Sequence, residues 1–252
     1  MIIEALSVFP EVFEGYMSAS IMGRAQRAGL VEFRSHDLRD WTHDRHRTVD
    51  DEPYGGGAGM LMKVPPIAEA VAALSSTPGE PSPHVVFFTP SGAPFTQRAA
   101  ERLAACDRIL FVCGRYEGID ERAYALADER ISIGDFVLTG GELAALVVTD
   151  AVVRLIPGAL GDEMSNRDES FSTEEGGGLL EYAQYTRPAE FEGAGVPEVL
   201  LSGDHARVAA WRRRDAIERT CRWRPDLIET AALTAEERAW AREYIESSEK
   251  GV

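Results

Sequence analysis

Two glycine-containing stretches decide the fold: SIGDFVLTGGE, residues 132–142, and CGRYEGID, residues 113–120. The second directly follows a short apolar run, and the first begins with the last two residues of another. These runs, RILFV at 108–112 and ERISI at 129–133, have the composition of buried strands, and glycines follow both of them. In an open α/β sheet, ligands bind outside the carboxyl ends of the strands, where glycine lets backbone groups come close to a ligand. The two strand ends therefore predict two walls of one small-molecule cleft.

A third strand, predicted at 84–88, ends in Thr89-Pro90-Ser91-Gly92 and predicts a further wall of the cleft. Two more strands are predicted at 2–8 and 30–35, and helices at 11–28, 65–74, 96–105, 121–128 and 141–156. Because strands and helices alternate, residues 1–160 are expected to form an α/β domain with a mostly parallel sheet.

The composition changes after residue 160. Residues 161–178 carry six acids and three closing glycines, which predicts a mobile linker. Residues 179–252 are expected to form a helical domain. A helix is predicted from His205 after a capping turn, and a capping box from Thr234 to Glu237 before the last helix.

The overall composition is that of a soluble globular protein, with 44% hydrophobic and 27% charged residues among 252. No apolar run approaches the roughly 20 residues of a membrane helix, and the first residues lack the basic start of a signal peptide. The three cysteines, Cys106, Cys113 and Cys221, show neither metal spacing nor a disulfide framework, which favours a cytoplasmic protein.

The net charge of −16 argues against a protein that coats nucleic acid generally. Between residues 205 and 224, however, seven arginines stand against two acids. Such a segment is either a local phosphate-binding face or an ordinary solvated helix face.

A long polar loop, residues 39–60, joins the second predicted strand to the next helix. Its two histidines, His43 and His46, have no third metal ligand nearby, and no metal site is predicted. Its GGGAGM stretch lacks the Lys-Ser/Thr ending of a P-loop and breaks the dinucleotide-binding pattern at Met60. The loop is either merely flexible or, as its length and composition favour, a substrate loop in which Trp41 and Tyr54 could stack on bases.

No nucleophile elbow or Walker sequence occurs elsewhere in the chain. The polar residues near the glycine turns are Arg115, Tyr116, Glu117, Asp120, Asp135, Thr139 and Glu142, with Arg154 one helix later. Carboxylates and arginine around a cleft suit a cationic cofactor and a group-transfer reaction.

Several longer motifs in this order resemble those of the bacterial tRNA (guanine-37-N1)-methyltransferases, a family of the SPOUT class: HDRHRTVDDEPYGGGAGM, CGRYEGIDER, SIGDFVLTGGELAAL, PGALG, QYTRP and VPEVLLSGDHA. The resemblance implies a parallel sheet with a deep trefoil knot and the use of S-adenosylmethionine. It implies methylation of N1 of guanine 37, beside the anticodon, in tRNAs with guanine at 36 and 37, which helps maintain the reading frame. It also implies a homodimer with each active site at the subunit interface, where the second subunit and the helical domain of residues 179–252 grip the tRNA, and it allows Mg²⁺ to assist catalysis.

The resemblance also assigns site residues. Cofactor-binding positions would be Phe87, Phe88, Thr89, Pro90, Gly114, Tyr116, Gly118, Ser132, Ile133, Gly134, Asp135, Phe136, Val137, Leu138, Gly140 and Gly141. Core packing is the alternative role for the apolar members. Substrate-binding positions would be His43, Arg45, His46, Asp50, Tyr54, Gly59, Arg207 and Arg214.

For catalysis, the resemblance places Glu117 near the cofactor and the guanine, and Arg154 beside guanine O6. The family pattern around the general base is Asp-Ser-Phe, whereas this chain has Asp168-Glu169-Ser170-Phe171. The Ser-Phe pair aligns Glu169 with the base, and Asp168 is the alternative. A SPOUT methyltransferase for another RNA base, and an RNA-binding protein with an inactive cleft, are the competing functions.

Overall fold

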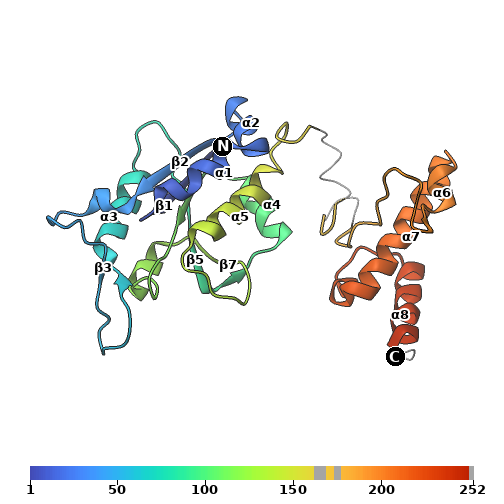
Figure 1. The fold of residues 1–252 in the computed structure, drawn as a ribbon. Helices are drawn as coiled ribbons and strands as arrows, with labels where there is room; N and C mark the ends of the chain where they lie inside the picture. The colour runs from blue at the N-terminus through green and yellow to red at the C-terminus, as the bar shows by residue number, and fades with distance from the viewer. Residues whose placement is uncertain (162–168, 173–176, 250–252) are drawn as a thin grey trace. The chain divides into compact units, whose positions relative to one another are not determined.

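The computed structural model describes residues 1–161, 169–172 and 177–249, and for residues 248–249 it describes the backbone alone. The chain forms two compact units, Met1–Asp162 and Glu163–Val252, and each is described by itself (Figure 1).

The first unit is built on a five-stranded sheet in which all neighbouring strands run parallel. The order across the sheet is β2-β1-β6-β5-β7. The strands are β1 (Ile2–Ser7), β2 (Glu32–Asp37), β5 (His84–Pro94), β6 (Arg108–Val112) and β7 (Glu129–Ser132). The prediction of an α/β fold with a parallel sheet is confirmed.

Helices cover both faces of this sheet (Figure 1). Side chains alternate along β6, so Ile109 and Phe111 pack on one side while Leu110 and Val112 pack on the other. The first side is covered by α1 (Glu14–Ser18), α2 (Ser20–Arg27), α4 (Gln97–Ala104) and α5 (Glu142–Val153). The second is covered by α3 (Val64–Ser75) and two 3₁₀ helices, Leu38–Trp41 and Glu121–Leu126. The predicted helix at 121–128 is therefore a shorter 3₁₀ helix.

The single helix predicted at 11–28 is wrong. The structure has a 3₁₀ helix, Pro10–Phe13, then α1 and α2, with extended backbone at Ala19 between them. Gly23 allows this break, because a Cβ there would lie 2.2 Å from the carbonyl oxygen of Ser18. Only a glycine lets the end of α1 fold back so closely onto α2.

The strand predicted at 84–88 continues to Pro94 as β5. Its pairing with β7 is irregular between Phe88 and Ala93. A Cβ on Gly92 would lie 2.5 Å from the backbone of Ile131, so this glycine permits the close approach of the two strands. The predicted end of this strand is thus a bulge within a longer strand.

The second unit contains α6 (Glu198–Leu201), α7 (His205–Trp223), a 3₁₀ helix (Pro225–Glu229) and α8 (Ala235–Glu249), with a small hairpin of β8 (Glu190–Phe191) and β9 (Ala194–Gly195). Both predicted caps are present. The Asp204 carboxylate accepts a hydrogen bond from the Arg207 amide at 3.1 Å. Thr234 and Glu237 each accept a hydrogen bond from the other's amide, at 3.1 and 2.8 Å. Within the described residues, no helix is long and apolar enough to cross a membrane.

Candidate active site

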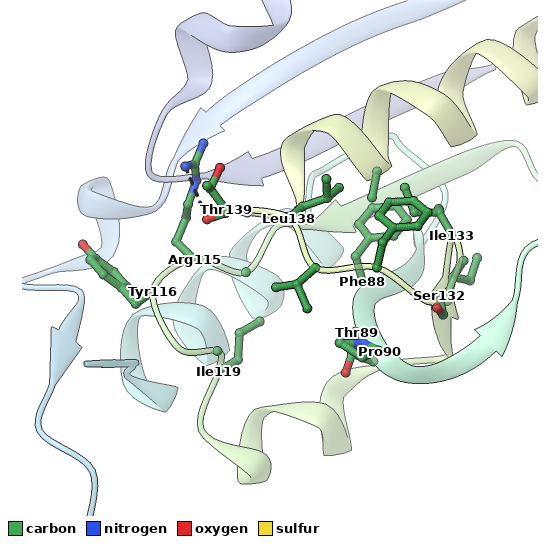
Figure 2. A pocket seen from close by; sticks show the side chains of 18 of the residues that line it. Phe88, Thr89, Pro90, Arg115, Tyr116, Ile119, Ser132, Ile133, Leu138 and Thr139 are labelled. Atoms are coloured by element: carbon green, nitrogen blue, oxygen red, sulfur yellow. Dashed lines mark hydrogen bonds between the residues drawn. The ribbon is translucent and has the colours of Figure 1, made fainter. Parts of the chain in front are cut away.

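A cavity of about 220 Å³ lies at the bulge of β5 and the carboxyl ends of β6 and β7, where the sequence predicted a cleft (Figure 2). Arg115 and Thr139 lie at one end of it, and Ser132 and Ile133 at the other. Every predicted cofactor-binding residue lines this cavity except Phe87 and Asp135. Phe87 points to the opposite face of the sheet, where its ring lies 5.5 Å from that of Tyr124.

The two glycine walls are in direct contact. The amide of Gly141 donates to the carbonyl of Gly114 at 2.8 Å, and Arg115 pairs with Gly140 in an isolated antiparallel bridge. A Cβ on Gly141 would lie 2.8 Å from Cα of Cys113. The walls can be this close only because glycine occupies the position.

A buried carboxylate ties these walls to the sheet. Glu142, the first residue of α5, is 1% exposed and lies 2.9 Å from Nε of Arg115. The hydroxyl of Ser7, at the end of β1, donates to the same carboxylate at 2.5 Å. The Arg115 guanidinium also lies 4.7 Å from the centre of the Phe9 ring. Arg115 therefore lines the cavity in an orientation held by Glu142 and Phe9.

The nearest thiol is not set up as a nucleophile. Cys113 is fully buried, and burial, with the nearby charge of Glu142, raises the pKa of its thiol well above the ordinary value. A thiolate would be needed for nucleophilic attack. The described residues also contain no group of three or more His, Cys, Asp or Glu side chains that could hold a metal ion.

The end of the long loop docks onto the GRYEGID turn. The Glu117 amide donates to the Met60 carbonyl at 3.0 Å, and the Met62 amide donates to the Gly118 carbonyl at 2.9 Å. A Cβ on Gly59 would lie 2.3 Å from Cγ of Glu117, so the Glu117 side chain rests on this glycine. Glu117 lines the cavity. The Glu117 side chain therefore contacts the loop and lines the cavity at the same time.

A second contact joins the loop to the cavity through Tyr116. The loop forms β3 (Asp50–Asp51), which pairs with β4 (Leu61–Met62). Partial burial raises the pKa of the Tyr116 phenol. The negative charge of Asp50 and a hydrogen bond to Asp50 raise it further. Tyr116 has φ of +61°, a conformation uncommon outside glycine, and the surrounding contacts must hold it there.

The middle of the loop is organised by its own side chains. The Asp44 carboxylate accepts from the His46 amide at 3.1 Å, the Thr48 amide at 2.9 Å and the Thr48 hydroxyl at 2.7 Å. Arg47 forms an ion pair with Asp40. Arg45, His46 and Tyr54 are exposed, and His43 lies 2.7 Å from Glu69 of α3. The loop is therefore a folded surface that presents polar and aromatic groups.

In the second unit, most arginines of the basic segment have partners. Arg213 binds Glu237 at 2.8 Å, Arg214 binds Glu218 at 3.2 Å, and the Arg212 guanidinium lies 4.6 Å from the centre of the Tyr182 ring. Arg207, Arg212 and Arg214 are exposed, so their charges remain accessible to a phosphate.

Of the two predicted candidates for the general base, the structure describes Glu169 and not Asp168. Glu169 lines a groove of the second unit, together with Tyr182, His205 and Arg212. Asp168 lies outside the described residues. Arg154 is the C-cap of α5, and its amide donates to the Asp150 carbonyl at 3.2 Å.

Arg115 and Thr139, which the sequence placed among the polar residues near the glycine turns, both line the cavity. The lining also includes residues that were not predicted at the cleft: Ile119, Tyr124, Ile131 and Ala144. For these four, no local pattern separates a core residue from a lining residue.

Comparison with known proteins connects this geometry to an activity. Residues 1–230 match the family model described as "tRNA (Guanine-1)-methyltransferase TrmD". The chain is 49% identical to a "tRNA (guanine-N(1)-)-methyltransferase" of Syntrophotalea carbinolica, over 100% of this chain and 99% of the relative. Relatives of the same description from Anaeromyxobacter sp. and Dictyoglomus turgidum are 54% and 51% identical, over 92% and 93% of both chains.

Proposed function

Because this chain belongs to the tRNA (guanine-1)-methyltransferase family, we propose that it transfers a methyl group from S-adenosylmethionine to N1 of guanine 37 in tRNAs that carry guanine at 36 and 37. The observation that carries the proposal is the glycine-walled cavity whose rim holds Glu117 against the long loop. The modified base lies beside the anticodon, so the reaction helps maintain the reading frame. The SPOUT class to which the family belongs matches the observed parallel sheet, and the knot implied by the resemblance stays a prediction.

The cavity suits this cofactor. Apolar side chains such as Phe88, Ile133 and Leu138 can pack on an adenine ring, and the glycine backbone of both walls can approach it closely. When bound, S-adenosylmethionine supplies a methyl group on a positively charged sulfur, so that N1 gains the methyl and the sulfur leaves as a neutral thioether. Glu117 provides negative charge on the cavity rim.

The remaining task of the protein is to remove a proton from guanine. N1 carries a hydrogen and is a poor nucleophile until that hydrogen leaves. We assign Glu169 as the general base that accepts this proton, with Asp168 as the alternative. Negative charge then moves toward O6, where we assign the Arg154 guanidinium the role of stabilising it.

Arg154 supports a composite site in a homodimer. Gly141, the N-cap of α5, and Ala144 in its first turn lie at the cavity, whereas Arg154 is the C-cap at the other end of the helix. The rise over these residues is about 15 to 20 Å, which is longer than an arginine side chain can span. Arg154 of one chain therefore serves the cavity of a second copy.

The exposed face of α5 offers a surface for that copy. Leu143 and Val147 are each more than half exposed, and Arg154 follows on the same face of the helix. Phe9, Val12 and Tyr16, from the segment that packs beside α5, are also exposed. Apolar groups gathered on one face mark a protein interface.

The activity is tested by incubating the protein with labelled S-adenosylmethionine and a tRNA transcript that has guanine at 36 and 37. Label should enter the wild-type transcript, and digestion should yield N1-methylguanosine. A transcript with adenine at 37 is the control and should gain no label. Label on a different base would instead support another SPOUT methyltransferase, and cofactor-free RNA binding without transfer would support the binding protein.

The composite site is tested by mixing two inactive variants. Arg154→Ala and Glu117→Ala should each be nearly inactive alone. After subunit exchange, the mixed dimer has one site with both residues intact, so activity should return in part. A mixture that stays inactive, in dimers shown to exchange, contradicts a site shared between subunits.

We further propose that Mg²⁺ assists catalysis, and titration with EDTA in the transfer assay tests whether the ion is required. We also propose that the protein acts in the cytoplasm, because its proposed substrate is tRNA.

A further inference from the structure

Residues 169–172 are hydrogen-bonded to residues 178–181 of the second unit. The Phe171 amide donates to the Leu179 carbonyl at 2.8 Å, and the Glu181 amide donates to the Ser170 hydroxyl at 2.9 Å. The Gly178 amide also donates to the Ser172 carbonyl. The residue before Ser170 is Glu169, so its backbone is held beside residues 178–181.

This neighbouring segment is itself fixed to α7. Leu179 is 1% exposed and belongs to the core formed by α7 and α8. The Leu180 amide donates to the hydroxyl of Thr220 at 2.9 Å, and Thr220 is fully buried in α7. The chain of contacts therefore runs from the helix core through residues 179–181 to Ser170.

Phe171 strengthens the same attachment. Its φ of +70° is unusual for a residue with a large side chain, so its contacts must compensate for the strain. The Arg224 guanidinium lies 5.8 Å from the centre of its ring. The turn therefore has a defined shape.

Glu169 is half-buried at a groove of about 340 Å³ in this unit, beside Tyr182, His205 and Arg212. The same groove thus combines a carboxylate with cationic and aromatic side chains of α7 and its neighbour. Cationic and aromatic groups are the ones that bind the phosphates and bases of RNA.

We propose that Ser170 and Phe171 are positioning residues that attach the general base Glu169 to the helical unit in a defined position. The unit that grips the tRNA would then also carry the general base. This inference rests on the proposed function. It makes proton removal conditional on correct docking of the helical unit with the tRNA. A tRNA bound only through the long loop and the cavity would keep its N1 proton, and specificity would follow from two separate contacts.

Ser170→Ala tests this attachment, because it removes the acceptor of the Glu181 amide and leaves Glu169 in place. At saturating tRNA and S-adenosylmethionine, kcat should fall about 10- to 100-fold, while KM for tRNA and the cofactor Kd stay within twofold. The deficit should narrow as the pH rises toward the range where guanine N1 loses its proton unaided. Hydrogen exchange of the Glu181 amide should become faster.

Three further variants complete the design. Ser170→Thr keeps a hydroxyl acceptor and should restore kcat. Ser247→Ala removes a hydroxyl that donates to the Tyr244 carbonyl within α8 and should behave as wild type. Phe171→Asn keeps a residue that tolerates positive φ but removes the ring; it should lower kcat like Ser170→Ala and serves if that variant does not fold.

The outcomes separate the two proposals. Ser170→Ala with kcat within twofold of wild type, or with only KM raised, overturns the positioning role. Full activity of Glu169→Gln overturns the base assignment and this inference together, while leaving the methyl transfer. A wild-type protein that methylates no tRNA overturns the proposed function itself.

Discussion

Two buried groups of charged residues lie in the first unit, and they do different work. In one, Arg108 of β6 lies 2.6 Å from Glu4 of β1, and both are 1% exposed. His36 of β2 adds a contact to Glu4 at 2.9 Å. In the other, Glu142 binds Arg115 and Ser7 at the ends of the strands.

The first group joins strands inside the sheet and touches no residue of the cavity. The second joins the two walls of the cavity to the end of β1. Burying charge is costly, and a buried pair is weak evidence for net stability. The comparison suggests that the first pair secures the sheet, whereas the second fixes the shape of the cofactor site.

The largest effect is expected from Glu142→Ala. It leaves the partly buried Arg115 guanidinium without its carboxylate, which should lower the free energy of unfolding by about 3 kcal/mol. The two glycine walls should also shift relative to each other. The cofactor Kd, measured by calorimetry on the folded variant, should therefore rise at least tenfold. A Kd within twofold of wild type would show that this group serves stability alone.

Glu4→Gln should lower the free energy of unfolding by about 2 kcal/mol and leave the cofactor Kd and kcat unchanged. Burial opposes ionisation of Glu4, but hydrogen bonds from His36 and Arg108 outweigh it and hold the pKa below its ordinary value of 4.5. The stability from this ionised carboxylate is therefore present above pH 4.5 and is lost as the pH falls below it.

Chemical denaturation of wild type and Glu4→Gln between pH 3 and pH 7 checks this prediction. The difference between them should shrink at the acid end. A change in cofactor affinity in this variant would remove the distinction between the two groups.

Ser7→Ala should have a smaller effect within the second group. The hydroxyl donates to Glu142 and accepts from the Phe9 amide at 2.9 Å, so its removal should lower the free energy of unfolding by about 1 kcal/mol. Cofactor Kd should rise only a few-fold, because Arg115 still holds Glu142. Thermal unfolding and calorimetry with the same preparation give both values.

The smallest effect is expected from an exposed pair. The Tyr16 hydroxyl donates to Asp150, and this bond, with some burial, raises the pKa of the phenol from 10 to about 12. The contribution is therefore full below pH 10 and is lost as the pH rises through about 12. Tyr16→Phe should lower the free energy of unfolding at pH 7 by less than about 1 kcal/mol. Urea denaturation measures this difference from wild type, which should vanish near pH 12. A constant difference across the range would contradict this account.

The sequence located the cleft well because strand ends and glycines are local signals. The runs at 108–112 and 129–133, each followed by glycine, predict where a parallel sheet opens. The pairing of Glu142 with Arg115 and Ser7 could not be predicted, since it joins three segments that are distant in sequence.

The errors have equally specific causes. The break between α1 and α2 depends on contact between Gly23 and the Ser18 carbonyl, which periodicity does not report. The order within the long loop comes from Asp44 and Arg47 bonding to nearby residues, where composition indicated only polarity. The proposals for the cofactor and the general base came from the family resemblance, because no pattern of residues alone could identify them.

Gly141 also limits how the enzyme could escape an inhibitor. Any codon change that replaces this glycine introduces a Cβ about where Cys113 already lies, at 2.8 Å from its Cα. Substitution there should therefore disturb the native site along with any compound bound to it. An inhibitor that binds mainly to the backbone of this wall should therefore select few resistance mutations at Gly141.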